Sequence, residues 1–232
     1  MARFWSKCDN KNQKSIIIID MKIEKSIIRI EDVPWIQYFD GQININLTDI
    51  KIDPNAQYIV GSIKSYDDLA IVSYIAQIVR PHTLRMYLIS PFIMGQRSDR
   101  PFTERASFGF KYIADQINYC QFDEVFILDA HSDVIPALIN NCTSHSIEIA
   151  LNQIDIDWKN VIMVSPDAGA YKKSKKIADT VGCMLIPAVK VRLEDGTPEV
   201  KIMGDVAGRD IVIIDDIYDG GRTFESLSIQ LK

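Results

Sequence analysis

Short apolar runs alternate with amphipathic segments along most of the chain. The runs are rich in isoleucine and valine, and several are apolar throughout, which is typical of strands buried on both faces. We expect strands at Ser15–Ile19, Ile27–Ile30, Gln42–Leu47, Tyr58–Ser62, Leu84–Ser90, Glu124–Ala130, Val161–Pro166, Cys183–Ala188, Glu199–Met203 and Ile211–Ile217.

Helices are expected between these strands. The clearest is Ser65–Val79, in which a serine and two aspartates can cap the start of the helix. Its apolar side chains recur with the period of a helix and fall on one face: Leu69, Val72, Ile75 and Ile78. Similar patterns cover Arg105–Tyr119, Ser144–Leu151 and Ala170–Val181. Alternating strands and helices predict an α/β architecture with mainly parallel sheets.

A polar stretch, Asn152–Lys159, divides the chain into two such halves. We therefore expect an N-terminal domain at 1–150 and a C-terminal domain at 151–232. Each half contains an apolar strand that runs into polar residues, at Phe126–His131 in the first and Ile211–Asp216 in the second. Open α/β sheets bind ligands beyond the carboxyl ends of their strands, so both positions are candidate sites.

Composition excludes several classes of protein. With 232 residues, 47% of them apolar, the chain can bury a substantial core. It has no run of eighteen apolar residues and no apolar leader, so we expect a cytoplasmic protein without a membrane partner. Four scattered cysteines without a C-x-x-C pair indicate neither a disulfide framework nor a zinc site. A formal charge of −5 argues against nucleic-acid binding.

The most informative motif is the segment Ile211–Thr223, IVIIDDIYDGGRT. Carboxylates after an apolar strand can face ribose hydroxyls or magnesium, while loop N–H groups and a helix N-terminus can face a phosphate. The simpler interpretation is a strand that ends in a polar turn, with Gly220 and Gly221 supplying positive φ. The segment resembles the phosphoribosyl pyrophosphate (PRPP) signature of type I phosphoribosyltransferases and PRPP synthetases.

A second motif, Ser165-Pro-Asp-Ala-Gly169, follows the strand Val161–Val164. It is similar to the S-P-D-x-G-G segment of PRPP synthetases, whose aspartate, here Asp167, contributes to the metal and substrate site. Four lysines come soon after it, and the simplest interpretation makes them a solvated helix face: Lys172, Lys173, Lys175 and Lys176.

Three segments of the first half follow in the order of the same family. Tyr38–Gln42 is similar to F-x-D-G-E, which contacts the adenine of ATP in a neighbouring subunit. Pro91–Phe102 resembles the P-Y-x-x-x-x-R-Q-D-R loop at the nucleotide. Leu128–Ser132 resembles the D-L-H segment, whose histidine lies at the metal and triphosphate. The resemblance thus implies ATP-binding residues at Phe39, Asp40, Gln42, Arg97, Asp99 and His131.

A lone histidine at a strand end is more often a structural residue than a ligand. Because His131 belongs to this ordered set of motifs, we expect it to be a ligand and not only a structural residue.

The last motif is Val189-Lys-Val-Arg192, which precedes the segment Met203–Asp210. PRPP synthetases carry K-x-R on a loop just before G-D-V-x-G-[KR]. By resemblance, Lys190 and Arg192 are catalytic and stabilise charge on the transferred phosphoryl group, as this chemistry requires. The simpler interpretation is an exposed basic pair at a hairpin end.

The resemblance implies two tandem type I phosphoribosyltransferase-like domains with the active site between them. It also implies a diphosphokinase in which the C1 hydroxyl of ribose 5-phosphate attacks the β-phosphorus of Mg-ATP. His131 and Asp167 would hold Mg²⁺, and the enzyme would be a homo-oligomer. The sugar phosphate would contact Asp215, Asp216, Asp219, Gly220, Gly221, Arg222 and Thr223.

One loop departs from the family pattern, which is D-T-x-G-T where this chain has Asp219-Gly-Gly-Arg-Thr223. The change removes a hydroxyl group and adds a cation. If Arg222 pairs with a second phosphate, the acceptor would be 5′-extended, such as ADP-ribose, and the enzyme would serve NAD salvage.

The motifs also allow a phosphoribosyltransferase that consumes PRPP, although such an enzyme would not need the ATP motifs of the first half. A catalytically silent regulatory subunit is favoured by the sequence ending at Lys232, where the family continues, so that the chain is either shortened or truncated. The retained Lys190-x-Arg192 pair argues against a silent subunit. The acceptor, the oligomer size and any allosteric effector stay open.

Overall fold

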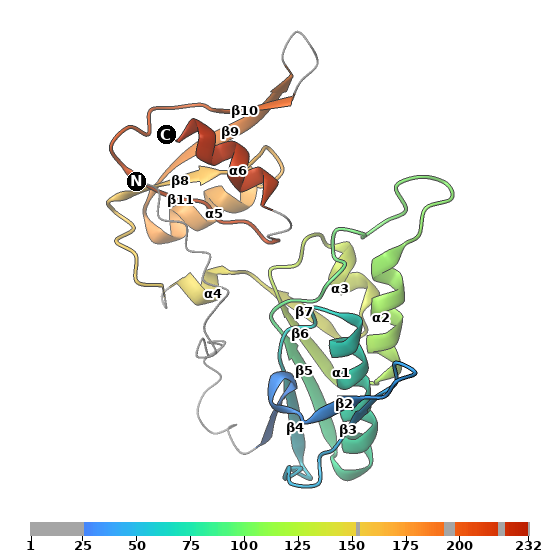
Figure 1. Ribbon diagram of the computed structural model, residues 1–232. Helices are drawn as coiled ribbons and strands as arrows, with labels where there is room; N and C mark the ends of the chain where they lie inside the picture. The colour runs from blue at the N-terminus through green and yellow to red at the C-terminus, as the bar shows by residue number, and fades with distance from the viewer. Residues whose placement is uncertain (1–25, 152–153, 193–197, 218–220, 232) are drawn as a thin grey trace. The chain divides into compact units, whose positions relative to one another are not determined.

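The structure, a computed structural model, describes residues 26–151, 154–192, 198–217 and 221–231 (Figure 1). These residues form two compact units that divide between Ile147 and Glu148. We call residues 26–147 the first unit and the residues from Glu148 onward the second unit.

A five-stranded parallel sheet forms the first unit, in the order β1-β4-β5-β6-β7. Its strands are β1 (Ile27–Arg29), β4 (Ala56–Val60), β5 (Arg85–Ser90), β6 (Glu124–Leu128) and β7 (Cys142–His145). Parallel neighbours need crossover connections. Three of them contain α1 (Tyr66–Val79), α2 (Gly109–Tyr119) and α3 (Val134–Leu138), which lie on one side of the sheet in Figure 1. Short 3₁₀ turns occur at Ile30–Asp32 and Arg80–His82.

Helix α1 begins as its sequence predicts. Ser65 accepts a hydrogen bond from the N–H of Asp68, and the Asp68 carboxylate accepts one from the N–H of Ser65, a reciprocal capping box. Of the four apolar side chains expected on one face, Leu69, Val72 and Ile75 are buried and Ile78 packs against the core.

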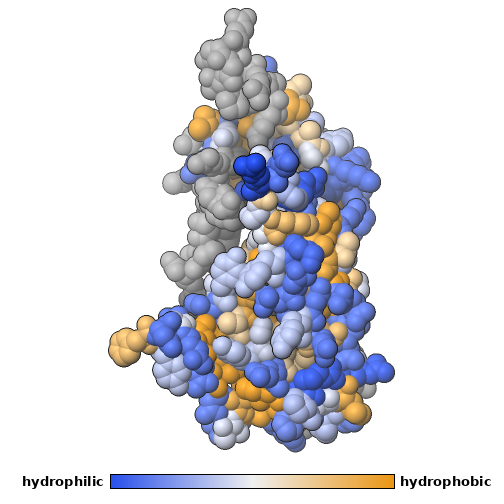
Figure 2. Space-filling model, turned by 90° about the vertical axis from the view of Figure 1, so that its right-hand side faces the viewer, coloured by the Kyte–Doolittle hydropathy of each residue, from blue (hydrophilic) through white to orange (hydrophobic). Residues whose placement is uncertain are grey.

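A hairpin of β2 (Trp35–Gln37) and β3 (Ile43–Ile45) projects from the first unit. Ile43 and Ile45 are buried, whereas Trp35 and Ile36 are exposed and Phe39, at the turn, is fully exposed. Figure 2 shows a projection with an apolar tip at the lower left, at the height that β2 and β3 have in Figure 1. The hairpin therefore presents large apolar side chains to solvent.

The second unit has a four-stranded sheet in the order β10-β9-β8-β11, parallel except for β10. The strands are β8 (Val161–Ser165), β9 (Met184–Arg192), β10 (Pro198–Ile202) and β11 (Asp210–Val212), and the helices are α4 (Glu148–Leu151), α5 (Tyr171–Val181) and α6 (Arg222–Gln230). Strand β9 pairs with β8 only up to Pro187 and then continues with β10 alone. A two-stranded ribbon thus extends beyond the carboxyl end of β8.

The two units have unequal cores. Among the described residues, the first unit has a cluster of 27 buried apolar side chains, and the second unit has a cluster of six. Ile162, Val164 and Ala188, from β8 and β9, belong to the smaller cluster.

Most expected strands are confirmed within two residues at each end, although Ser15–Ile19 lies outside the described residues. The expected strand Cys183–Ala188 continues four residues further, to Arg192, and Ile211–Ile217 ends five residues earlier, at Val212. The expected helix Arg105–Tyr119 begins four residues later, at Gly109. The expected helix Ser144–Leu151 is wrong at its start, because residues up to His145 form β7 and pair with β6. Only Glu148–Leu151 is helical. The sheet edge left by β6 offers backbone hydrogen bonds that outweigh the weak helical pattern of this polar segment. Hairpin strand β2 was not expected. Within the described part of the chain, no helix combines the length and apolar character needed to span a membrane.

Candidate active site

The carboxyl edge of the second-unit sheet gathers three aspartates. Strands β8 and β11 are parallel neighbours, with Val212 opposite Met163. Asp167 follows β8 by two residues and Asp215 follows β11 by three, so both leave the sheet at the same edge. This edge is where open α/β sheets bind their ligands.

These carboxylates affect one another's ionisation. Partial burial raises the pKa of Asp215 to about 6, and the carboxylates of Asp216 and, more weakly, Asp167 add to the rise. The backbone N–H of Asp216 donates to Oδ1 of Asp215 (3.1 Å). Like charges at close range disfavour ionisation of one another, so this cluster is suited to a ligand that brings positive charge or hydroxyl donors.

Asp167 lies in a well-defined turn between β8 and α5. The hydroxyl of Ser165 donates to the backbone carbonyl of Asp167 (2.9 Å), and Oδ1 of Asp167 accepts the N–H of Ala170 (2.9 Å). At Gly169 a β-carbon would lie 3.2 Å from that same Oδ1, which is tight. The small residue therefore leaves space for the Asp167 carboxylate.

The ribbon of β9 and β10 carries the predicted catalytic pair. Lys190 lies opposite Val200 and Arg192 opposite Pro198, both beyond the carboxyl end of β8. Their side chains are not described. Both residues thus lie on a ribbon that extends beyond the sheet edge where the three aspartates are found.

The expected sugar-phosphate loop is described only in part. Asp219 and Gly220 lie outside the described residues. Gly221 is buried and adopts a left-handed conformation (φ +71°), which favours glycine, immediately before α6. Helix α6 begins at Arg222. The side chains of Arg222 and Thr223 are not described.

A second polar cluster lies in the first unit, where the loops after β5 and β6 meet. Asp99, only 4% exposed, accepts two hydrogen bonds from Arg100 (both 2.7 Å) and one from the hydroxyl of Ser132 (2.7 Å). The bonds from Arg100, with help from Ser132, hold the pKa of Asp99 well below its usual range. Asp99 is therefore ionised and fixed in place.

His131 lies beside this carboxylate and contributes to the depressed pKa of Asp99 through its charge. Its backbone N–H donates to Oε1 of Gln96 (3.0 Å). His131 is an exposed residue at the carboxyl end of the sheet. Arg97 is also exposed, on the loop after β5. The structure thus brings Asp99 and His131 together, with Arg97 on the same loop as Asp99.

At the tip of the β2–β3 hairpin, the other three expected ATP-binding residues share one turn. Gly41 has φ +89°, the N–H of Gln42 donates to Oδ1 of Asp40 (3.0 Å), and Phe39 is exposed. Asp40 therefore supports the turn through one carboxylate oxygen.

Comparison with known proteins identifies relatives of the chain. A family model described as "Phosphoribosyl transferase domain" matches residues 134–228. Proteins named ribose-phosphate pyrophosphokinase are similar over longer stretches. The Aquifex aeolicus protein is 26% identical over 204 residues, which is 84% of this chain and 65% of its own length. The Corynebacterium efficiens protein is 33% identical over 147 residues, 60% of this chain and 45% of its own length.

The chain is thus similar to proteins named ribose-phosphate pyrophosphokinase over most of its length. It spans between about half and two thirds of the length of the curated relatives it matches. A solved structure, phosphoribosylpyrophosphate synthetase from Mycobacterium smegmatis, superposes with a TM-score of 0.70 at 21% identity, covering 86% of this chain and 67% of the other. The α/β fold expected from the sequence, with tandem phosphoribosyltransferase-type domains, is confirmed.

Two residues of the first-unit cluster were missed by sequence reasoning. Gln96 and Ser132 fall at positions that the motifs of the ribose-phosphate pyrophosphokinase family leave open. Their role emerges only when the loops after β5 and β6 lie side by side, with Gln96 bound to the backbone of His131 and Ser132 bound to Asp99. No local sequence signal marks such a contact.

The oxygen ligands of the second-unit cluster suit the Mg²⁺ that the ribose-phosphate pyrophosphokinase family implies. Mg²⁺ in phosphoryl-transfer enzymes is commonly held by one or two carboxylates together with substrate phosphates and water. Within the described residues, no group of three or more metal-binding side chains is arranged to hold an ion without such help. Asp167 and His131, expected to share the metal, belong to different units.

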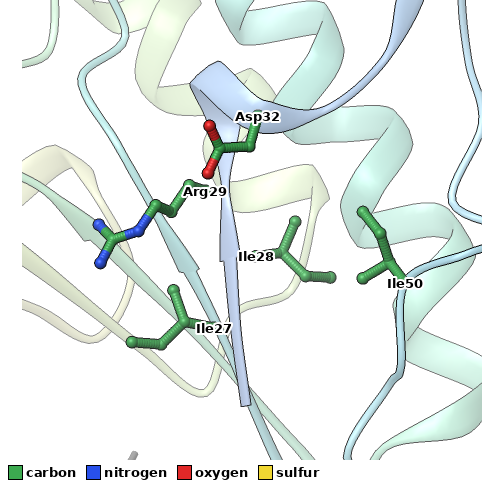
Figure 3. A pocket seen from close by; sticks show the side chains of 5 residues that line it. All are labelled: Ile27, Ile28, Arg29, Asp32 and Ile50. Carbon is green, nitrogen blue, oxygen red and sulfur yellow. The ribbon is translucent and has the colours of Figure 1, made fainter. Parts of the chain in front are cut away.

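A hollow of about 390 Å³ lies beside the edge strand β1 (Figure 3). Ile28 points toward Ile50 on one side of β1, and Ile27 and Arg29 lie on the other. Its lining is largely isoleucine and includes none of the expected site residues. We assign it no part in the site.

Proposed function

We propose that this protein is a Mg²⁺-dependent transferase that moves the β,γ-pyrophosphate of ATP to the C1 hydroxyl of ribose 5-phosphate, giving PRPP and AMP. The main support is the second-unit cluster, in which Asp167 lies near Asp215 and Asp216 at one sheet edge from which the ribbon of Lys190 and Arg192 also extends. The names of the relatives support the same activity.

In this proposal the second unit holds the sugar phosphate. Asp215 and Asp216 accept hydrogen bonds from the ribose hydroxyls. The N-terminus of α6, together with the loop of Asp219 to Thr223, receives the 5′-phosphate, because backbone N–H groups and the helix dipole favour an anion there. The high pKa of Asp215 fits this role, since hydroxyl donors stabilise its ionised form.

The first unit supplies the nucleotide contacts. Asp99 and His131 are fixed beside each other, Arg97 is on the adjoining loop, and Phe39, on the hairpin, offers an aromatic ring for a base. Because Phe39 is fully exposed, we propose that it serves the nucleotide of a neighbouring copy and that the protein is a homo-oligomer.

The reaction forms a bond from the sugar O1 to the β-phosphorus and breaks the bond from that phosphorus to the bridging oxygen of AMP. The hydroxyl proton passes to solvent. Lys190 and Arg192 meet the negative charge on the transferred group, which is the main requirement of phosphoryl transfer. Mg²⁺, held by Asp167 and His131, would neutralise charge on the triphosphate. No side chain forms a covalent intermediate.

A direct assay tests this proposal. The protein is incubated with Mg-ATP and ribose 5-phosphate, and AMP and PRPP are measured by mass spectrometry. The Asp215→Asn/Asp216→Asn variant serves as the control and should lose turnover. Formation of ADP in place of AMP, or no product from the wild type, would refute the proposal.

One observation favours a second sugar substrate as the acceptor of the pyrophosphate group. Gly221 has a left-handed conformation, and α6 begins directly with Arg222, so a cation stands at the helix start where the family usually has small residues. An arginine there can bind a second phosphate bidentately. The same chemistry would then act on a 5′-extended acceptor such as ADP-ribose, a reaction of NAD salvage.

The Arg222→Ala variant separates the two acceptors. If ADP-ribose is a substrate, its binding should weaken by about 1.5–3 kcal/mol, the range for a hydrogen bond to a charged group, and ribose 5-phosphate should be less affected. Equal losses for both acceptors, or no loss for either, would remove Arg222 as the residue that selects between them.

A further inference from the structure

Gln96 is a buried amide at the carboxyl edge of the first-unit sheet. It is 3% exposed, and both ends of its side chain are used. Nε2 donates to the backbone carbonyl of Ile93 within its own loop (3.1 Å), and Oε1 accepts the backbone N–H of His131 from the loop after β6 (3.0 Å). One side chain thus joins two loops that are 35 residues apart in sequence.

The loop that contains His131 is held at each successive residue. Asp129 has a left-handed conformation (φ +57°), unusual for a residue other than glycine, and its N–H donates to the carbonyl of His145 (2.6 Å). The N–H of Ala130 donates to the hydroxyl of Ser144 (3.1 Å). The hydroxyl of Ser132 donates to Asp99. The bond from His131 to Gln96 lies between these contacts.

Gln96 therefore holds the backbone N–H of His131, the residue expected to contact the nucleotide. Because Gln96 belongs to the loop after β5, the same hydrogen bond also fixes that loop relative to His131. This loop carries Arg97 and Asp99. Strained backbone persists only where its surroundings over-determine it, and the unusual φ of Asp129 meets that condition here.

We propose that Gln96 is a positioning residue for His131, so that it acts on turnover without contacting substrate. The inference rests on the proposed function, in which His131 meets the triphosphate and its metal. Displacing a catalytic group by about 1 Å can cost about 100-fold in rate, whereas a bond that only stabilises the fold leaves turnover unchanged.

The chain offers a matched control at the opposite end of the sheet. Gln57 is also fully buried, Oε1 accepts the N–H of Asp53 (2.9 Å), and Nε2 donates to the carbonyl of Ser26 (2.5 Å). It makes the same two kinds of bond before the amino-terminal ends of β1 and β4, away from the loops after β5 and β6.

The test compares Gln96→Met with Gln57→Met, each of which removes a donor and an acceptor with little change in length. We expect kcat to fall about 10- to 100-fold in Gln96→Met and to stay within about twofold in Gln57→Met, with KM for ribose 5-phosphate unchanged in both. Gln96→Glu keeps an acceptor for the His131 N–H and should recover most of the loss. Equal kcat in the two methionine variants, or no recovery in Gln96→Glu, overturns the proposal.

Two further measurements keep the result decisive. If Gln96→Met does not fold, Gln96→Asn, which withdraws the amide by one methylene group, is compared with wild type in its place. If the wild type shows no turnover, the proposed function fails by itself. The inference then depends on the amide exchange rate of His131 by NMR, which should rise about tenfold or more in the Gln96 variant and not in Gln57→Met. An unchanged rate overturns it.

Discussion

Replacing Asp215 with asparagine should stabilise the unliganded protein at neutral pH while it weakens the site. In the wild type, burial and the neighbouring carboxylates of Asp216 and Asp167 make ionised Asp215 unfavourable in the folded state. Its pKa rises from 3.8 to about 6. A shift of about two units corresponds to about 3 kcal/mol as an upper limit. Because the carboxyl group is partly exposed and shares its charge with Asp216, we expect about 1–2 kcal/mol.

The sign of the pH dependence follows from the raised pKa. Between pH 3.8 and about 6 the folded wild type binds more protons than the unfolded chain, so its stability falls as pH rises through that range. The asparagine variant does not lose stability in this way, because its side chain does not ionise. The gain from Asp215→Asn should therefore be near zero at about pH 4 and complete by about pH 7.

Urea unfolding at a series of pH values, followed by circular dichroism and by tryptophan fluorescence, to which Trp158 of the same unit contributes, measures this difference. Asp155→Asn, at an exposed aspartate of the second unit, is the control and should show no such trend. A pH-independent difference, or an Asp215→Asn protein that is less stable than wild type near pH 8, would refute the reasoning.

Three further predictions concern the ribbon, the hairpin and helix α1. Lys190→Ala and Arg192→Ala should each lower kcat by orders of magnitude and leave sugar binding intact, whereas Lys201→Ala on the same ribbon should not; near-wild-type turnover in either variant removes that role. Light scattering should show at least a dimer that Phe39→Asp weakens, and a monomeric wild type with full activity would contradict this. Ser65→Ala should lower the free energy of unfolding by about 1 kcal/mol through loss of the helix cap, and an unchanged urea midpoint would argue against the capping box.

Local pattern was enough to predict the elements that carry strong periodicity or caps. Helix α1 begins with the cap that Ser65 and Asp68 form, and the apolar runs from Tyr58 onward became strands of two sheets. The start of the expected helix at Ser144 was wrong, because that segment pairs with the edge of β6. Its structure depends on a partner distant in sequence, which no local propensity reports.

In the candidate site, too, some residues could be predicted from the sequence and others could not. Asp215 and Asp216 could be found because they follow an apolar strand, and Asp167 through the resemblance of its segment to that of PRPP synthetases. Parallel register brings these positions to one edge. Gln96 could not be found, because its importance lies in a bond to the backbone of His131, and any residue type can offer that N–H. Contacts between side chains and a distant backbone leave no trace in a motif.

The unequal size of the two cores affects how freely this protein can change over evolutionary time. Among the described residues, a cavity made in the cluster of six buried side chains removes a larger share of the clustered packing than one made in the cluster of 27. Random substitutions at Ile162, Val164 or Ala188 should therefore be eliminated more often than those in α1. New acceptor specificity in the second unit is then most accessible through its surface loops, whose residues contribute little to that small core.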